Sequence, residues 1–322
     1  MHVLVYGAGV QGSLYAARLR EHGHDVALLA RGQRLRDLRD HGIILEDIVS
    51  GRRTVTPVTV VERLDPADAY DLAMVPVRRE QVGAILPVLA AAERIPTMLF
   101  MHNHAGGSDE LVDAVGRERV LLGFPGASGA REGPVVRYAL IPQQPTTLGE
   151  LDDRPSPRLR GIADVLRAAG FRVAISRKMD AWLKTHAMFV TAVSGALYLA
   201  GGDNERLARM PDGVPLFTRG VREGFGALDA LGLPPPPANL RAIFGWIPNH
   251  ITVTYWRRLF ASPRGEYYFA LHARTAWDEA SALAAEVRAL LRESGRPTLA
   301  FDRLCVAIDA YAAAHGSPTA MQ

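Results

Sequence analysis

The stretch VLVYGAGVQG, from Val3 to Gly12, decides the fold of the first half of the chain. Its apolar start predicts a strand, and the glycines that follow have the spacing GxGxxG. An amphipathic run, Ser13–His22, predicts a helix, and a second apolar run, Val26–Ala30, predicts the next strand. A strand, a glycine turn, a helix and a strand within about thirty residues are typical of a dinucleotide-binding unit.

The three glycines have different tasks in such a turn. Gly7 allows the chain to bend sharply, Gly9 lets a pyrophosphate approach the backbone, and Gly12 lets the helix pack closely. Free N–H groups and the positive end of the helix dipole then face the phosphates. The expected cofactor contacts are therefore the residues of the whole turn: Gly7, Ala8, Gly9, Val10, Gln11 and Gly12.

The end of the second strand indicates which dinucleotide binds. An NAD-binding unit usually places an acidic residue there to hold the ribose 2′-hydroxyl. Here the strand is followed by Arg31, with Arg34 and Arg36 close behind. A guanidinium matches a 2′-phosphate in charge and in its forked donors. We therefore predict that the cofactor is NADP(H).

Composition narrows the class of protein. A chain of 322 residues, 48% of them hydrophobic, predicts two domains with substantial cores. The net charge is only +3 and basic residues alternate with acidic ones, so we expect a small anionic ligand and no nucleic-acid partner. No apolar run reaches the roughly 20 residues of a membrane span. The one cysteine, Cys305, and the lack of a signal peptide predict a cytoplasmic protein with a reduced thiol, and a homodimer is left open.

Strand and helix patterns alternate as far as residue 176 and then give way to helices alone. We therefore predict an α/β fold, with a Rossmann-type doubly wound parallel sheet over residues 1–176 and an all-α domain over residues 177–322. The active site is expected in the cleft where the helical domain faces the carboxyl edges of the early strands. The predicted strands are 3–6, 26–30, 54–61, 72–77, 97–102, 120–123, 135–140, 146–151 and 171–175. The predicted helices are 13–22, 81–92, 110–115, 158–169, 180–199, 216–231 (ended by the prolines 234–237), 240–247, 253–260, 268–291 and 297–314.

Lysine is unusually scarce, because the 37 basic side chains include only Lys178 and Lys184. A lysine can release a proton, whereas an arginine stays charged at any working pH. Lys184 begins the helical domain, and Glu279 lies on a later helix. We predict that Lys184 donates a proton to a carbonyl oxygen and stabilises its developing charge during hydride transfer, with Glu279 as its partner. The alternative is a salt bridge between the two helices.

Two further polar residues follow predicted strands. Asn103 precedes two glycines, where its amide could bind both the nicotinamide and a substrate; the alternative is an ordinary turn residue. Arg78 could neutralise a cofactor phosphate or a substrate carboxylate. We expect no metal, because His102 and His104 flank Asn103 without a further ligand at suitable spacing.

At this point the chain resembles the ketopantoate reductase family, the 2-dehydropantoate 2-reductases, nearly from end to end. The family's glycine turn and following arginine match Gly7, Gly9, Gly12 and Arg31, and its strand-end lysine is matched in charge by Arg78. Its Asn-Gly segment matches Asn103, although His104 replaces the glycine. The resemblance implies a catalytic lysine at Lys184 and a catalytic glutamate at Glu279, sixteen residues before the GRPT segment that begins at Gly295. It also implies reduction of a 2-oxo acid by NADPH.

The chain departs from this family at the substrate contacts. Two asparagines and a serine of the family are replaced by Met188, Ala192 and Tyr267. The hydride machinery is kept, but the polar groups that hold ketopantoate are lost, and Trp182, Met188 and Tyr267 are expected to form a more apolar wall. The predicted substrate contacts are Asn103, Met188, Thr191, Tyr267 and His272, of which His272 lies on the helical face of Glu279 and Met188 and Thr191 lie on that of Lys184.

The leading interpretation is thus an NADPH-dependent reductase of a 2-oxo acid or related ketone, with conversion of 2-dehydropantoate to pantoate as one case. A second interpretation is the reduction of an imine or a bulkier ketone on the same fold. A third is a non-catalytic NADP-binding sensor or scaffold, against which the retention of Lys184 and Glu279 argues.

Overall fold

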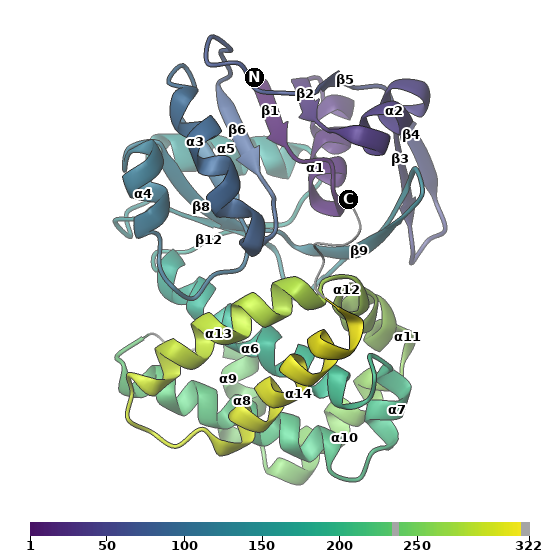
Figure 1. The fold of residues 1–322 in the computed structure, drawn as a ribbon, viewed down its shortest axis with the longest axis vertical. Helices are drawn as coiled ribbons and strands as arrows, with labels where there is room; N and C mark the ends of the chain where they lie inside the picture. The colour runs from purple at the N-terminus through teal and green to yellow at the C-terminus, as the bar shows by residue number, and fades with distance from the viewer. Residues whose placement is uncertain (234–237, 317–322) are drawn as a thin grey trace. The chain divides into compact units, whose positions relative to one another are not determined.

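A computed structural model describes residues 1–233 and 238–316, which leaves the four prolines predicted to end a helix outside the described residues (Figure 1). The chain divides into two compact units. The first comprises Met1–His102 and Ser108–Asp180, and the second comprises Asn103–Gly107 and Ala181–Gln322. The short segment Asn103–Gly107, which follows a strand of the first unit, therefore groups with the helices of the second.

The first unit contains an eight-stranded sheet. In spatial order its strands are β12 (Val173–Ile175), β11 (Thr146–Gly149), β8 (Val120–Phe124), β7 (Met98–Met101), β6 (Leu72–Val75), β1 (His2–Tyr6), β2 (Asp25–Leu29) and β5 (Thr59–Val61). All neighbours run parallel except β8 and β11. The interior strand β1 pairs Val3 with Val26 of β2 on one side and with Leu72 of β6 on the other. This sheet confirms the predicted α/β class.

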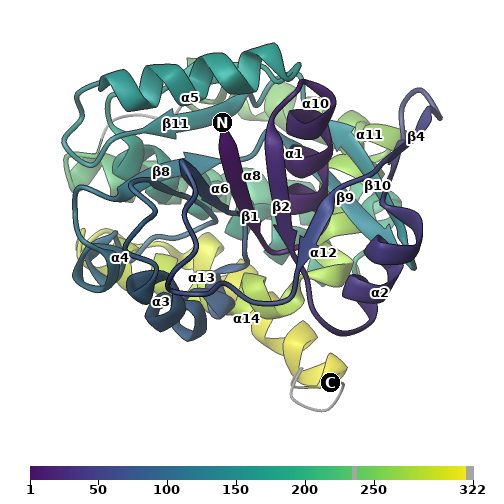
Figure 2. The ribbon, with the colours of Figure 1, turned by 90° about the horizontal axis from the view of Figure 1, so that it is seen from above.

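Helices cover both faces of this sheet, as a doubly wound fold requires. They are α1 (Val10–Glu21), α2 (Gly32–His41), α3 (Val82–Ala91), α4 (Asp109–Val115) and α5 (Pro157–Ala168), and the 3₁₀ turn η1 (Arg79–Gln81) precedes α3. Figure 2 shows α5 and α3 on opposite sides of the sheet. Apolar side chains of α1 and α5 share one buried core with β1.

A second sheet corrects two of the predicted strands. It consists, in spatial order, of β4 (Arg53–Thr56), β3 (Ile43–Asp47), β10 (Val135–Leu140) and β9 (Ala127–Glu132). The predicted strand over 54–61 is two strands in different sheets, since Pro57 lacks the N–H that a ladder needs and ends β4. The predicted strand over 135–140 exists, but it belongs to this smaller sheet, where it pairs with β3 and β9.

The second unit is helical. Its helices are α6 (Met179–Leu199), α7 (Asn204–Arg209), α8 (Gly213–Ala230), α9 (Ala238–Arg241), α10 (Asn249–Phe260), α11 (Pro263–Gly265), α12 (Leu271–Thr275), α13 (Trp277–Arg292) and α14 (Leu299–His315), with π turns η2 (Ala242–Trp246) and η3 (Glu266–Ala270). Their apolar faces form one continuous core. Within the residues described, no helix combines the length and apolar character needed to cross a membrane.

The predicted helix over 268–291 is broken. It starts as the π turn η3, continues as α12, and is interrupted at Ala276, whose φ is −132° and ψ is 35°. The hydroxyl of Thr275 turns back to donate to the carbonyl oxygens of Leu271 and His272, at 3.3 and 3.0 Å. Such local side-chain bonds satisfy the carbonyls at a helix end and compete with continuation of the helix.

Cys305 should serve as a probe of unfolding, because its side chain is fully buried in the core of the second unit. Burial raises the pKa of this thiol to about 12, so at pH 8 it is both inaccessible and protonated. We expect Ellman's reagent to label the native protein several orders of magnitude more slowly than the denatured protein, since labelling requires opening of the core. Labelling of the native protein at the rate of a free thiol would show that this core is open.

Candidate active site

The glycine turn connects β1 to α1 and has the geometry that the motif predicts. Gly7 has a φ of +114°, which favours glycine. A Cβ on Gly12 would lie 1.8 Å from the Gly7 carbonyl oxygen, so the start of α1 packs directly on the turn. A Cβ on Gly9 would meet no atom within 4 Å. The open space at Gly9, in front of the N-terminus of α1, fits the pyrophosphate of a dinucleotide.

Side chains of α1 hold this turn in place. The Gln11 amide donates to the Ala127 carbonyl of β9 at 2.7 Å, and the Ser13 hydroxyl donates to the Ala8 carbonyl at 3.2 Å. The Gln11 contact ties the first turn of α1 to a strand of the small sheet. The smaller sheet therefore supports the cofactor turn, a role that sequence patterns do not reveal.

The three arginines after β2 have different environments. Arg31 is the N-cap of α2 and its side chain is exposed. Arg36 donates to the Gln33 side chain on the surface of α2. Of the three, Arg31 is thus placed at the strand end, where the sequence predicts contact with the 2′-phosphate.

Arg34 is a structural residue of the glycine turn. It is only 8% exposed, and its guanidinium donates to the Ala8 carbonyl at 3.2 Å, the Pro134 carbonyl at 2.9 Å and the Ser13 hydroxyl at 2.9 Å. Burial lowers its pKa to about 10, which leaves it charged at neutral pH. Because its guanidinium is bonded to Ala8 and Ser13, Arg34 stabilises the glycine turn.

Arg78 lies after β6, as the N-cap of η1. Its backbone N–H donates to the Gln81 side chain at 3.4 Å, and its side chain is half-buried. Its neighbour Arg79 forms an ion pair with Glu110 of α4 at 2.7 Å. The strand β6 ends at Val75, two residues earlier than predicted, so Arg78 lies in the turn that follows it, and its proposed contact with cofactor or substrate stays a prediction.

In the second unit, Glu279 is the centre of a polar cluster. The Asn103 amide nitrogen donates to Glu279 Oε1 at 3.0 Å, and His272 Nε2 lies 3.8 Å from Oε2. Glu279 is 7% exposed, so its carboxylate is held in a largely buried position by these two neighbours. The structure therefore brings together three residues that the sequence predicts for the site: Asn103, His272 and Glu279.

A second glutamate on α13 was not predicted. Glu286 Oε2 accepts hydrogen bonds from the backbone N–H groups of Ala105, at 2.9 Å, and Gly106, at 3.2 Å. Its spacing of seven residues from Glu279 places both on one helical face, and this is the signal that sequence reasoning could have used. The five-residue segment after β7 is thereby bound to α13.

Helix α6 carries Lys184 near its start. Lys184 is half-buried, and further along the helix Met188 and Thr191 are 0% and 1% exposed. Met188 packs in the core, where its side chain fills the space left by the missing side chain of Gly224. Thr191 is similarly enclosed, and the substrate contacts expected of Met188 and Thr191 stay predictions.

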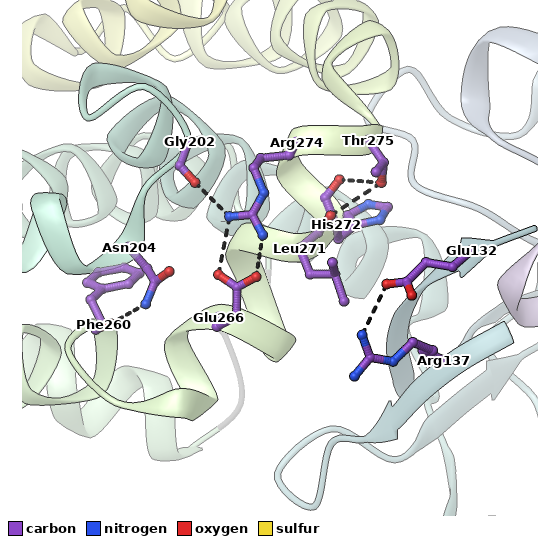
Figure 3. Close-up of polar contacts among 10 residues, drawn as sticks. All are labelled: Glu132, Arg137, Gly202, Asn204, Phe260, Glu266, Leu271, His272, Arg274 and Thr275. Atoms are coloured by element: carbon purple, nitrogen blue, oxygen red, sulfur yellow. Dashed lines mark hydrogen bonds and ion pairs between the residues drawn. The ribbon is translucent and has the colours of Figure 1, made fainter. Parts of the chain in front are cut away.

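The end of α6 is joined to the helix that carries His272. The Tyr198 hydroxyl donates to the Ala273 carbonyl of α12 at 2.7 Å. Figure 3 shows Arg274, also on α12, donating to the Gly202 carbonyl and to the carboxylate of Glu266. These bonds fix the short helix α12, and with it the position of His272.

Two predicted wall residues lie in different surroundings. Trp182 stacks on His186 with ring centroids 5.0 Å apart, and desolvation lowers the pKa of His186 to about 3, so that its ring stays neutral. Tyr267 lines a hollow of about 440 Å³ together with Tyr255 and two arginines, Arg258 and Arg264. Across residues 1–233 and 238–316, no three His, Cys, Asp or Glu side chains gather in a way that could hold a metal ion.

Comparison with known proteins identifies relatives of this fold. A family model described as ketopantoate reductase PanE/ApbA matches residues 3–153. A 2-dehydropantoate 2-reductase from Archaeoglobus fulgidus is 26% identical over 216 residues, which cover 65% of this chain and 67% of that protein. The predicted resemblance to ketopantoate reductases is therefore confirmed.

Solved structures share the architecture over nearly the whole chain. The 2-dehydropantoate 2-reductase of Geobacter metallireducens superimposes with a TM-score of 0.78 and 17% identity, covering 97% of this chain and 100% of that one. D-mandelate dehydrogenase with NADH and anilino(oxo)acetate superimposes with a TM-score of 0.76 and 16% identity, covering 97% and 98%. At these identities the likeness establishes the shared fold.

Proposed function

We propose that this chain is an NADPH-dependent reductase of a 2-oxo acid or a related ketone. The proposal starts from the match of residues 3–153 to the ketopantoate reductase family. The observation that carries the proposal is the buried carboxylate of Glu279, held between Asn103 and His272. Burying a carboxylate costs free energy, and an apolar residue would fill the same space without that cost. A buried polar cluster of this kind within a helical unit therefore indicates a site for chemistry.

The first unit would hold the cofactor at the glycine turn. Gly9 leaves room for the pyrophosphate, Gly7 and Gly12 shape the turn, and Arg31 stands at the strand end where contact with the ribose 2′-phosphate is expected. When bound, the reduced nicotinamide supplies a hydride to the carbonyl carbon of the substrate. The rest of the work belongs to side chains of the protein.

Lys184 would complete the reduction by acting on the carbonyl oxygen. Its ammonium stabilises the negative charge that develops on this oxygen and then transfers a proton to it, which gives the alcohol. Glu279 would orient the reacting group, because its carboxylate accepts hydrogen bonds and is itself fixed by the Asn103 amide. The test is NADPH oxidation against a panel of 2-oxo acids, ketones and imines, followed by assay of the Lys184 and Glu279 variants.

Arg31 should determine the choice of nucleotide. In the variant Arg31→Ala we expect NADPH affinity to fall by about tenfold to a hundredfold, since a lost charge-assisted contact costs about 1.5–3 kcal/mol. NADH affinity should change little, because NADH has no 2′-phosphate. Titration of both cofactors, followed by nicotinamide fluorescence, measures the two constants. Arg36→Ala, which alters a surface arginine bonded to Gln33, is the control. Equal losses for NADPH and NADH in Arg31→Ala would contradict the assignment.

A bulkier ketone is the second candidate substrate. The replacement of a serine of the family by Tyr267 favours it, since the tyrosine and arginine side chains around Tyr267 would suit an aromatic or anionic substituent. An imine is a further candidate, because its carbon accepts a hydride in the same way as a carbonyl carbon. A non-catalytic NADP-binding sensor would bind NADPH but oxidise it with no member of the panel, so the same assay distinguishes it.

The cellular location, the kind of substrate and the oligomeric state of the protein stay predictions. We infer a cytoplasmic enzyme with a small carbonyl compound as its substrate, on the basis of its single buried thiol and its dispersed charge. Whether two copies form a homodimer is decided by light scattering of the purified protein.

A further inference from the structure

We propose that Glu286 is a positioning residue for the reaction, which acts by fixing Asn103 against Glu279. The inference rests on the proposed function, in which Asn103 contacts the nicotinamide or the substrate. Its basis is the pair of backbone hydrogen bonds that Glu286 accepts from Ala105 and Gly106.

The segment Asn103–Gly107 needs an external restraint. It contains the glycine pair Gly106-Gly107, and Gly107 has a φ of +89°, so its backbone has little preference of its own. Neither a helix nor a strand includes these residues. A single carboxylate oxygen that accepts two consecutive N–H groups restricts this backbone two and three residues after Asn103.

The two glutamates of α13 divide the task. Glu279 receives the side chain of Asn103, and Glu286, seven residues and about two turns further on, receives the backbone that follows it. The segment is therefore attached to one face of α13 at both ends. Glu286 has no chemical task in this arrangement, and its effect on the reaction passes through Asn103.

The geometry also determines how the Asn103 amide is presented. Its nitrogen must face Glu279, because a carboxylate can only accept. Its Oδ1 is enclosed and, among the described residues, has no hydrogen-bond partner. An enclosed amide oxygen of this kind is a ready acceptor for a donor on the bound ligand, provided that the segment keeps it in place.

A double-mutant cycle in the full-length protein tests the proposal. Glu286→Leu removes the acceptor, and we expect kcat/KM to fall by about tenfold or more. In the Asn103→Ala background the same change should have an effect of less than about twofold, because the residue on which Glu286 acts is gone. Glu286→Gln keeps an acceptor oxygen and should recover most of the activity. Glu293→Gln, which alters the exposed C-cap residue of the same helix, is the matched control and should behave as the wild type.

Hydrogen exchange separates positioning from loss of stability. The amides of Ala105 and Gly106 should exchange faster in Glu286→Leu than in the wild type, while the thermal transition stays close to that of Glu286→Gln. Losses of kcat/KM that multiply in the double mutant, or unchanged exchange at residues 105 and 106, would overturn the inference and leave the proposed function standing. If Glu286→Leu does not fold, the smaller loss in Glu286→Gln must itself vanish in the Asn103→Ala background, and its persistence overturns the inference. A wild-type protein that reduces no member of the panel would overturn both proposals.

Discussion

Replacing Lys184 with arginine should lower kcat by about two to four orders of magnitude, the range that a positioned general acid contributes. Arginine keeps the positive charge, but its guanidinium does not release a proton at working pH and is larger and planar. NADPH affinity should stay close to that of the wild type, because the contacts expected to bind the cofactor are those of the glycine turn and Arg31. Single-turnover measurement of NADPH oxidation isolates the chemical step.

The chain supplies a matched control for this experiment. Lys178, the only other lysine, is exposed just before α6, and Lys178→Arg should leave turnover unchanged. Because the two variants make the same chemical change a short distance apart, their difference reports the role of one ammonium group. Full turnover in Lys184→Arg, when chemistry is rate-limiting, would mean that another group delivers the proton.

Ketopantoate should be a poor substrate, with kcat/KM lower by orders of magnitude than for the best of the bulkier ketones in the panel. At the positions where the resemblance implies polar contacts, Met188 and Ala192 are apolar residues of the core, and Tyr267 replaces a serine, so the polar groups expected to hold ketopantoate are missing. A substrate hydroxyl without a partner in apolar surroundings costs on the order of 1–3 kcal/mol by protein mutational data. Two or three such missing contacts together lower kcat/KM by orders of magnitude.

Steady-state kinetics with both compounds and NADPH measures the ratio. Tyr267→Ser should shift this ratio towards ketopantoate, because it restores a hydroxyl and removes the ring. A specificity constant for ketopantoate of about 10⁵ M⁻¹s⁻¹ or more, typical of efficient enzymes, would show that the substitutions have not redirected the pocket.

The cofactor half of the site could be predicted from the sequence because its determinants are local. Gly7, Gly9 and Gly12 act within one turn, and the structure gives Gly7 its positive φ and Gly12 its contact with the Gly7 carbonyl. The position of Arg31 follows from the end of the strand before it. The periodicity of apolar residues within each segment predicts whether it is a strand or a helix, and the alternation of the two predicts the parallel sheet.

The substrate half depends on contacts between residues far apart in the chain. Asn103 and Glu279 are 176 positions apart, and only the packed structure joins them. The same holds for Glu286 and the backbone of Ala105. It also holds for Arg34, which the sequence groups with Arg31 after the second strand but which the structure buries as a support of the glycine turn. Residue type alone does not say which partner a polar group finds.

Helical periodicity was also a limited guide in the second unit. It placed Met188 on the face of Lys184, but the space beside Gly224 draws its side chain into the core. It placed His272 near Glu279 through one continuous helix, whereas the structure reaches this proximity across a break at Ala276. The sequence by itself determined most of the elements and the cofactor turn, because these follow from short-range backbone preferences. The tertiary structure decided which side chains became core and which became site, because burial depends on what the rest of the chain places beside them.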